Sequence, residues 1–200
     1  MKLTVKAALK SKTVQVHNNR KVNNIIYKKI MENKDKNLYR LDELSNYKIA
    51  SNYSDVRGWM IVDADNRTIG KIDNLWVNKD MQRVVYLDVK LDKGLIDDNR
   101  NEVRDVIAND NGKEFIYKEG DSHIIIPIGS VSINKDTKIV MANSIGYDTF
   151  RNTSRYNRQY NFDREYERKV MKSYYPENDP ESGYDSNDDA FYNRREFDNH

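Results

Sequence analysis

The sequence predicts a mainly β protein: a small, bent antiparallel β-barrel with short flanking helices and partly disordered termini. Short apolar runs, several of them alternating with polar residues, recur through the middle of the chain and indicate strands. Polar turn residues separate these runs, as in "NKDMQ" and "NKDT". No long helical pattern lies between them, which favours antiparallel pairing. Because a small open sheet exposes two edge strands, we expect it to close into a barrel or half-barrel.

The expected strands follow one another along the middle of the chain. They lie at 59–63, 68–77, 83–91, 124–127, 130–134 and 138–141. Apolar and polar side chains alternate imperfectly in the second of these, which predicts a β-bulge there. A leucine-containing stretch at 38–44 precedes them and predicts a turn or short strand leading into the domain.

Composition and charge divide the chain into three parts. Its 200 residues suffice for one domain with extensions, and a hydrophobic fraction of 38% indicates a compact centre with polar arms. The formal charge is +8 in residues 1–36, −2 in 37–156 and −4 in 157–200. We therefore expect a basic N-terminal extension at 1–37, a barrel domain at 38–156 and an acidic, aromatic tail at 157–200.

Two further elements are expected before the tail. The apolar spacing at 22–30 predicts a short helix. We favour a helix that caps the barrel or frays in solvent over one that binds a partner. A highly charged insertion at 93–122 interrupts the strands, and its small apolar islands predict one helical turn and one edge strand.

The tail carries a helical pattern of its own. Phe162, Tyr166, Val170 and Tyr174 recur every four residues, acidic residues lie near the start and basic ones near the end, and Pro176 follows as a stop signal. This predicts a short helix near 163–175. The rest of the tail lacks the apolar density to fold alone. Its aromatic residues are expected to dock either on the barrel or on another protein.

The stretch "DADNRT" poses the question of a metal site. Asp63 and Asp65 occupy the first and third positions of an EF-hand calcium loop, but Arg67 stands at the fifth, where an oxygen ligand is needed. The glycine and the final glutamate of such a loop are also missing, since Thr68 and Asn74 stand in their places. We therefore interpret the stretch as the turn of a β-hairpin.

No other pattern indicates catalysis. The chain has no cysteine, which excludes disulfides, thiolate nucleophiles and cysteine-bound metals. His17, His123 and His200 are far apart in sequence, and no local pattern joins one of them to a nucleophile. The glycines form neither a phosphate loop nor a dinucleotide fingerprint. We expect no catalytic, cofactor-binding or metal-binding residues, and no enzymatic activity.

Several sequence pieces, in their order and spacing, resemble the PRC-barrel domain. They are "RGW" at 57–59, "IGKIDNLWV" at 69–77, "RVVYLDV" at 83–89 and "IPIG" at 126–129. This domain is shared by the cytoplasmic part of the photosynthetic reaction-centre H subunit, small bacterial stress-associated proteins and the C-terminal domain of a ribosome maturation factor. The chain looks most like the stand-alone bacterial type. The resemblance implies a small, strongly bent antiparallel barrel and implies no catalysis.

Ten residues are expected to define the fold or to contribute to an interaction surface. Gly58 and Gly70 would relieve crowding where strands bend, and Pro127 suits an edge or bulge position. Large aromatic residues would fill or flank the interior. The full set is Arg57, Gly58, Trp59, Gly70, Trp76, Tyr86, Pro127, Gly129, Tyr166 and Tyr174.

The favoured function is that of a non-catalytic adaptor that binds a protein partner or a second copy of itself, with a stress-associated role implied by the resemblance. The alternative is an RNA- or ribosome-associated assembly factor that binds nucleic acid through the basic N-terminal arm. A role as a reaction-centre subunit is least favoured, because no membrane segment is expected: the apolar stretch at 124–133 is too short to span a bilayer. The N-terminus lacks the apolar core of a secretory signal, so we expect the protein in the cytoplasm.

Overall fold

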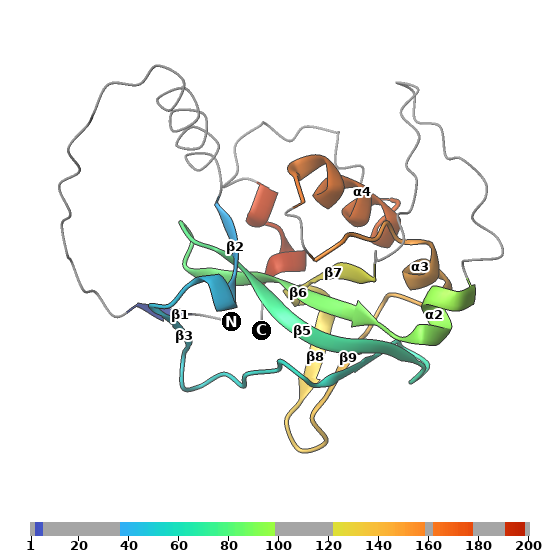
Figure 1. The fold of residues 1–200 in the computed structure, drawn as a ribbon, viewed down its shortest axis with the longest axis horizontal. Helices are drawn as coiled ribbons and strands as arrows, with labels where there is room; N and C mark the ends of the chain where they lie inside the picture. The colour runs from blue at the N-terminus through green and yellow to red at the C-terminus, as the bar shows by residue number, and fades with distance from the viewer. Residues whose placement is uncertain (1–2, 6–36, 99–121, 159–161, 178–190, 199–200) are drawn as a thin grey trace, which may run out of the picture.

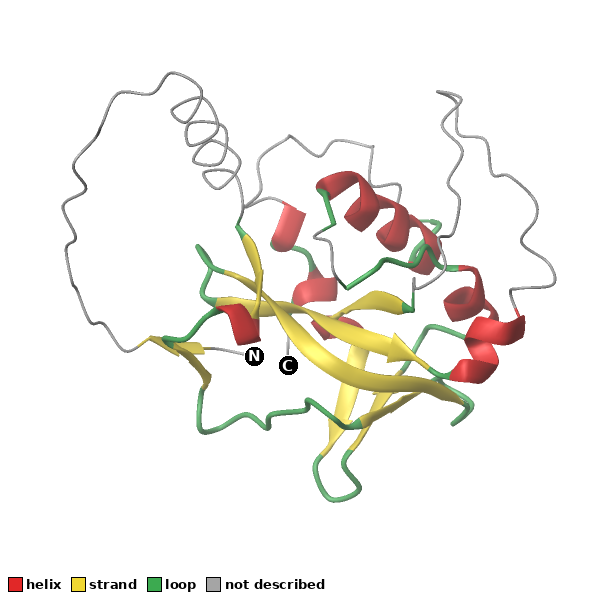
Figure 2. Cartoon of the chain, viewed as in Figure 1, coloured by secondary structure: helices red, strands yellow, loops and turns green. Residues whose placement is uncertain are grey.

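A computed structural model describes residues 3–5, 37–98, 122–158, 162–177 and 191–198. The helix expected at 22–30, most of the insertion with its edge strand, and part of the tail lie outside these residues. Strands dominate the rest, and a few short helices accompany them (Figures 1 and 2). The elements in chain order are β1 (Leu3–Val5), β2 (Leu38–Arg40), η1 (Leu41–Glu43), β3 (Tyr47–Ile49), β4 (Met60–Val62), β5 (Thr68–Asn78), β6 (Arg83–Leu91), α2 (Lys93–Asp98), β7 (His123–Pro127), η2 (Ile128–Ser130), β8 (Val131–Asn134), β9 (Ile139–Ala142), α3 (Tyr147–Asn152), α4 (Arg164–Tyr174) and η3 (Arg195–Phe197).

The sheet is a curled half-barrel, as the sequence predicts. Its strands are hydrogen-bonded in the order β7-β6-β5-β4-β9-β8, and β2 adds to the edge of β5 beside β4. The three residues of η2 join β7 to β8, so the two ends of this path are linked by a short piece of chain (Figure 2). A separate sheet of two strands is formed by β1 and β3.

One ladder differs from the antiparallel expectation. β4 and β9 pair in parallel, with Met60 opposite Ile139 and Val62 opposite Met141. All other ladders of the described residues are antiparallel. β9 pairs antiparallel with β8 and lies between β8 and β4 in the sheet, where it runs in the same direction as β4. The predicted bulge in β5 is confirmed, because the register of β5 against β6 shifts between Ile72 and Asn74 and again between Trp76 and Val77.

The inner face of the sheet carries the barrel core. Side chains directly opposite one another in a ladder lie on the same face. The inward rows therefore join Ile61 to Gly70 and Leu91, and Leu75 to Leu87 and Ile126. The side chains of this face are almost without exposure. Such packing of aliphatic side chains is the main source of stability for a domain of this size.

The outer face of the same sheet has two halves. The covered half consists of Trp76, Tyr86, Asp88 and Ile125, all buried beneath the C-terminal segment, by which we mean the described residues 156–158, 162–177 and 191–198. Figure 1 shows α4 and the residues near the C-terminus lying over β6 and β7. The open half consists of Met60, Lys71 and Lys90, which form one row across β4, β5 and β6 and are exposed.

Burial on both faces explains the composition of β6. Six successive residues of this strand, from Val84 to Val89, are buried, and the exposed Lys90 lies where the cover ends. A strand that is covered on both sides needs no polar face and becomes an almost continuous apolar run. That run is the reason that the sequence places β6 correctly at 83–91.

Candidate functional site

The structure divides the predicted residues between two places. Trp76, Tyr86, Gly129, Tyr166 and Tyr174 meet in the interface between the sheet and the C-terminal segment. Arg57 lies at the rim of a surface hollow, and Gly58 and Trp59, which follow it, are hydrogen-bonded to Ile72 of β5. Gly70 and Pro127 act through the backbone. The ideal Cβ of an alanine at position 70 would lie 2.1 Å from the Lys90 carbonyl oxygen, and Pro127 ends the terminal strand β7 with φ −58°.

Aromatic rings hold the C-terminal segment on the covered half. The Trp76 ring contacts Phe162 with 4.5 Å between ring centroids, and its Nε1 donates to the Tyr156 hydroxyl at 3.2 Å. Tyr86 packs edge-on against Phe197 at 5.2 Å. Edge-to-face contacts of this kind stabilise beyond the area that they bury. The side chains of Trp76 and Tyr86 therefore make their contacts within the same chain.

A buried carboxylate lies at the centre of this interface. Glu167 is only 4% exposed, and its Oε2 accepts hydrogen bonds from Tyr86 at 2.8 Å and Tyr192 at 2.7 Å. Arg164 lies 3.3 Å from the same oxygen and stacks over the rings of Tyr192 and Phe191. A buried carboxylate is tolerated when it is paired and hydrogen-bonded in this way. Glu167 thus joins β6, α4 and the residues after 190.

Backbone contacts complete the interface. Tyr174 donates to the Ile125 carbonyl at 3.0 Å, and Tyr166 donates to the Ser154 carbonyl at 2.8 Å. A Cβ at Gly129 would lie 2.5 Å from the Arg195 carbonyl oxygen, so only glycine lets η3 approach η2 this closely. Arg83 donates to the Tyr192 carbonyl and pairs with Asp198 at 3.3 Å. Of the two docking alternatives for the tail, the described residues adopt docking on the barrel.

A second buried carboxylate, Asp88, lies beside Tyr156. The Tyr156 hydroxyl donates to Asp88 Oδ1 at 2.5 Å, while Oδ2 has no hydrogen-bond partner in the described part of the chain. Burial raises the pKa of the Asp88 carboxyl to about 6, although the hydrogen bond from Tyr156 opposes the shift.

His123 lies at the edge of this polar group, on β7. Its Nε2 is 3.5 Å from Asp73 Oδ2, and Arg158 Nη1 contacts the same oxygen at 2.8 Å. Burial lowers the pKa of His123, and the nearby Asp73 carboxylate partly offsets this. The arginine side chain thereby ties the start of the C-terminal segment to β5.

The stretch at Asp63 is a hairpin turn, as predicted. Asp63 Oδ1 accepts the backbone N–H groups of Asp65 at 3.0 Å and Arg67 at 2.8 Å, and Oδ2 accepts from the Arg67 guanidinium at 2.7 Å. Asn66 supplies the positive φ of 61° that the turn requires. Burial would raise the pKa of Asp63, but these hydrogen bonds lower it below its ordinary value. Within the described ranges, no three histidine or carboxylate side chains are grouped as metal ligands.

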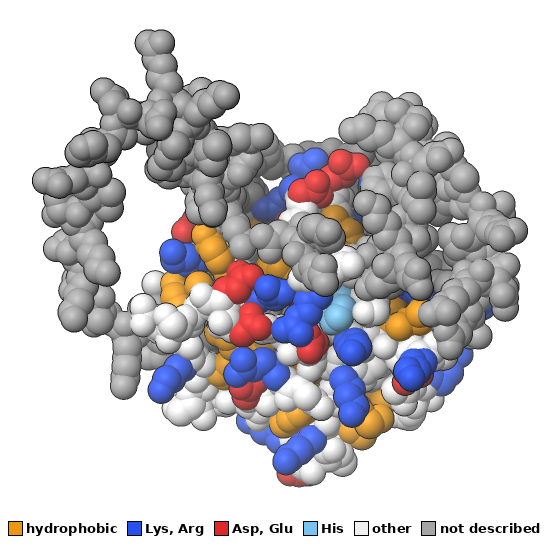
Figure 3. Space-filling model, viewed as in Figure 1, with side chains coloured by type: hydrophobic (Ala, Val, Ile, Leu, Met, Phe, Trp, Pro, Cys, Tyr) orange, Lys and Arg blue, Asp and Glu red, His pale blue; other side chains and the backbone are white. Residues whose placement is uncertain are grey.

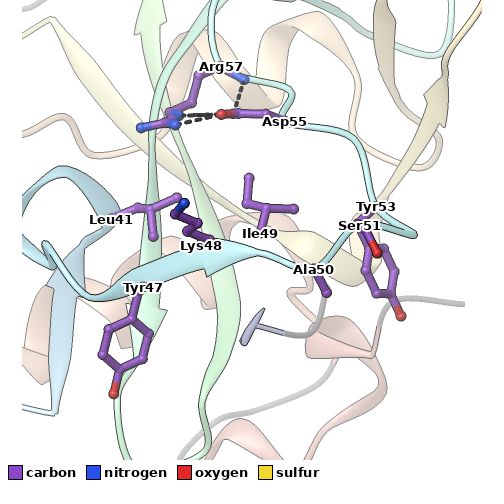
Figure 4. A pocket seen from close by; sticks show the side chains of 9 residues that line it. All are labelled: Leu41, Tyr47, Lys48, Ile49, Ala50, Ser51, Tyr53, Asp55 and Arg57. Carbon is purple, nitrogen blue, oxygen red and sulfur yellow. Dashed lines mark hydrogen bonds and ion pairs between the residues drawn. The ribbon is translucent and has the colours of Figure 1, made fainter. Parts of the chain in front are cut away.

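A hollow of about 330 Å³ opens between β3 and the arch formed by residues 51–57 (Figure 4). Its lining residues are Leu41, Tyr47, Lys48, Ile49, Ala50, Ser51, Tyr53, Asp55 and Arg57. Arg57 and Asp55 form a two-pronged ion pair at its rim, with Nε–Oδ1 at 2.9 Å and Nη2–Oδ2 at 2.5 Å. The hydrogen bonds from Arg57 lower the pKa of the Asp55 carboxyl, against the effect of burial.

Gly58 shapes the rim for a reason other than the predicted one. Among the described residues, no atom beyond its chain neighbours lies within 4 Å of a Cβ built at this position, so crowding is not the cause. Its φ of +82° lies in the left-handed region, which favours glycine, and its N–H donates to the Ile72 carbonyl at 2.7 Å. Trp59 follows, half-buried against the core, and its carbonyl accepts from the Ile72 N–H at 2.9 Å.

The curled sheet and its bulged central strand define a small β-barrel domain. Residues 49–145 match the family model of the PRC-barrel domain, and the chain therefore contains a PRC-barrel domain, as the sequence pieces predict. A comparison with curated proteins gave no matching relative. Among the described residues, none of the helices has the length and apolar character needed to cross a bilayer.

Several residues of these sites were not predicted from the sequence. Glu167 was overlooked because a charged residue in a charged tail reads as solvent-exposed. A usable signal exists, since Glu167, Val170, Met171 and Tyr174 follow the i, i+3, i+4, i+7 spacing of the buried face of α4. Tyr47 and Tyr53 of the hollow carry no comparable signal in the sequence.

Proposed function

We propose that this chain is a non-catalytic interaction module of the cytoplasm, an adaptor that binds another protein through the hollow beside β3. The PRC-barrel domain supports a role for the barrel as a scaffold. The observation that carries the proposal is the division of the predicted residues: the aromatic side chains of the covered half pack within the chain, whereas the hollow is left open by the residues that the structure describes.

The lining of the hollow is better suited to binding a side chain or loop of another protein than to catalysis. Its lining is mixed. Tyr47, Ile49 and Tyr53 contribute to it, Lys48 adds a cation, and the Asp55–Arg57 pair gives it a charged rim. Aromatic residues and arginine are the side chains that dominate binding energy at protein interfaces. The two titratable groups of the rim are occupied with one another, which leaves neither as a general acid or base.

The stress-associated role remains part of this proposal, as a condition under which the adaptor binds. No observation on the described residues favours the RNA- or ribosome-associated alternative. The basic residues that motivate it lie in 1–36, and the structure describes only β1 from that region.

Affinity purification from the native cell, with and without stress, tests the proposal. The bait is the full chain, compared with the double variant Lys48→Glu/Tyr53→Ala in the hollow. We expect a partner that the wild-type chain retains and that the variant loses by at least tenfold. Lys135→Glu, at an exposed position in the β8–β9 turn, serves as the matched control and should retain it. Equal recovery on all three baits, or no partner on any, would contradict the proposal.

A further inference from the structure

The strand β3 stands apart from the main sheet and already holds an extended segment. Its strand partner is β1, with Leu3 opposite Ile49, Thr4 opposite Lys48 and Val5 opposite Tyr47. Residues 6–36 separate this segment from the next described residue, Asn37. β1 therefore lies on the edge of β3 as a peptide would, without being a neighbour in sequence.

The same strand borders the hollow. Tyr47, Lys48 and Ile49 form β3 and also line the hollow (Figure 4). Peptide recognition by strand addition uses these two components together: backbone hydrogen bonds along an edge and a nearby pocket for alternate side chains. Within the described residues, β3 is the place where a short strand outside the seven-stranded sheet and a hollow coincide.

The pairing with β1 is suited to exchange. The ladder covers three residues on each side, and a two-stranded pairing of this size is marginal when it stands alone. The backbone N–H and C=O groups of β3 can form hydrogen bonds with an extended strand of any sequence that has free backbone groups. A longer extended segment could form the same hydrogen bonds and also place a side chain in the hollow.

We propose that the edge of β3 is a strand-addition site for an extended segment of a partner protein, and that Leu3–Val5 is a placeholder from the same chain. This rests on the proposed function and names the partner class: a segment free of proline that alternates apolar and polar residues, as Leu-Thr-Val does. The placeholder keeps the edge of β3 paired until the partner arrives, which also limits unspecific pairing of that edge.

The test frees the edge in the full chain and supplies a strand in trans. Thr4→Pro removes the central N–H of β1 and weakens its pairing, whereas Thr4→Ala is the matched control that retains it. The probe is a fluorescently labelled peptide, MKLTVKAA, which copies residues 1–8. Fluorescence anisotropy should show at least tenfold tighter binding of the peptide to the Thr4→Pro chain than to the wild-type and Thr4→Ala chains.

Two controls keep the result specific. The same peptide with proline in place of threonine should not bind, and adding Lys48→Pro to the Thr4→Pro chain should abolish binding. Circular dichroism should show that both chains keep the fold, since β1 and β3 lie outside the seven-stranded sheet.

Three results would overturn the inference. They are equal affinity of the peptide for all chains, no binding to the Thr4→Pro chain, and a wild-type dimer in sedimentation velocity that Thr4→Pro converts to a monomer. The last would identify a second copy as the occupant. If partner capture still depends on the hollow while the peptide fails to bind, the proposed function stands and strand addition alone is wrong.

Discussion

The two halves of the outer sheet face differ in what covers them, although they lie on the same strands. In the covered half, Trp76, Tyr86 and Asp88 are buried under the C-terminal segment. In the open half, Lys71 and Lys90 stand directly opposite one another in water, and no ion pair is formed by either within the described part of the chain. The comparison teaches that aromatic residues in a barrel strand do not by themselves mark a binding surface. Here the C-terminal segment of the same chain packs on these aromatic residues and buries them.

The largest expected effect comes from removing an aromatic side chain of the covered half. Tyr86→Ala deletes a buried ring and leaves Glu167 without one of its two tyrosine donors. Loss of stability on the order of 3–5 kcal/mol is expected from the cavity and the weakened network. Urea unfolding measures it. Lys90→Ala, four residues further along β6 on the same face, is the control and should change stability by less than about 0.5 kcal/mol. Similar losses for both would refute the division into two halves.

A pH effect comes next. The folded-state pKa of Asp88, about 6, lies above the ordinary value of 3.8, so the group contributes stability that is fully present below pH 3.8 and is lost as pH rises through 6. The shift corresponds to roughly 3 kcal/mol. Asp88→Asn cannot ionise, and its stability relative to the wild-type chain should therefore rise by about that amount between pH 4 and pH 7.

The readout is the difference between the two unfolding curves. The pKa of His123 is lowered in the folded state, so His123 makes the folded protein less stable as the pH falls. This opposes the effect of Asp88 in the wild-type chain, but it is common to both chains and cancels in the difference. A pH-independent difference between wild type and Asp88→Asn would show that Asp88 is not held as a buried carboxyl.

A smaller effect is expected where η3 meets η2. Gly129→Ala introduces a methyl group 2.5 Å from the Arg195 carbonyl oxygen and 2.6 Å from that of Asp198. Displacement of residues 191–198 should cost about 1–3 kcal/mol. Hydrogen exchange should become faster at these residues and remain unchanged in β4 and β9. Gly146→Ala is the matched control, because a Cβ there has open space around it in the part of the chain that the structure describes.

The smallest effect belongs to the open half. Lys71→Glu replaces a like-charged cross-strand pair with an opposite-charged one facing Lys90. A gain of about 0.2–1 kcal/mol is expected at low salt, and it should shrink at high salt because the pair is exposed. Thermal unfolding at two ionic strengths measures both. A loss of stability would indicate that Lys71 already has a favourable neighbour.

The fold was predictable to the extent that local pattern decides it. The apolar run of β6 and the period-four spacing of α4 each reflect burial that is visible in a short stretch. The parallel pairing of β4 with β9 was not predictable, because periodicity says nothing about which strands meet. Glu167 is buried only because Tyr86, 81 residues earlier, and Tyr192 converge on it. Gly58 was singled out for crowding, whereas its positive φ depends on a turn that only the folded backbone reveals.

The order of the sheet and its cover along the chain has a consequence for biosynthesis. Trp76 and Tyr86 leave the ribosome well before Phe197, the residue that packs on Tyr86. At ordinary rates of translation the interval is on the order of ten seconds. We therefore expect a nascent barrel to expose this aromatic surface until residues 191–198 have been synthesised.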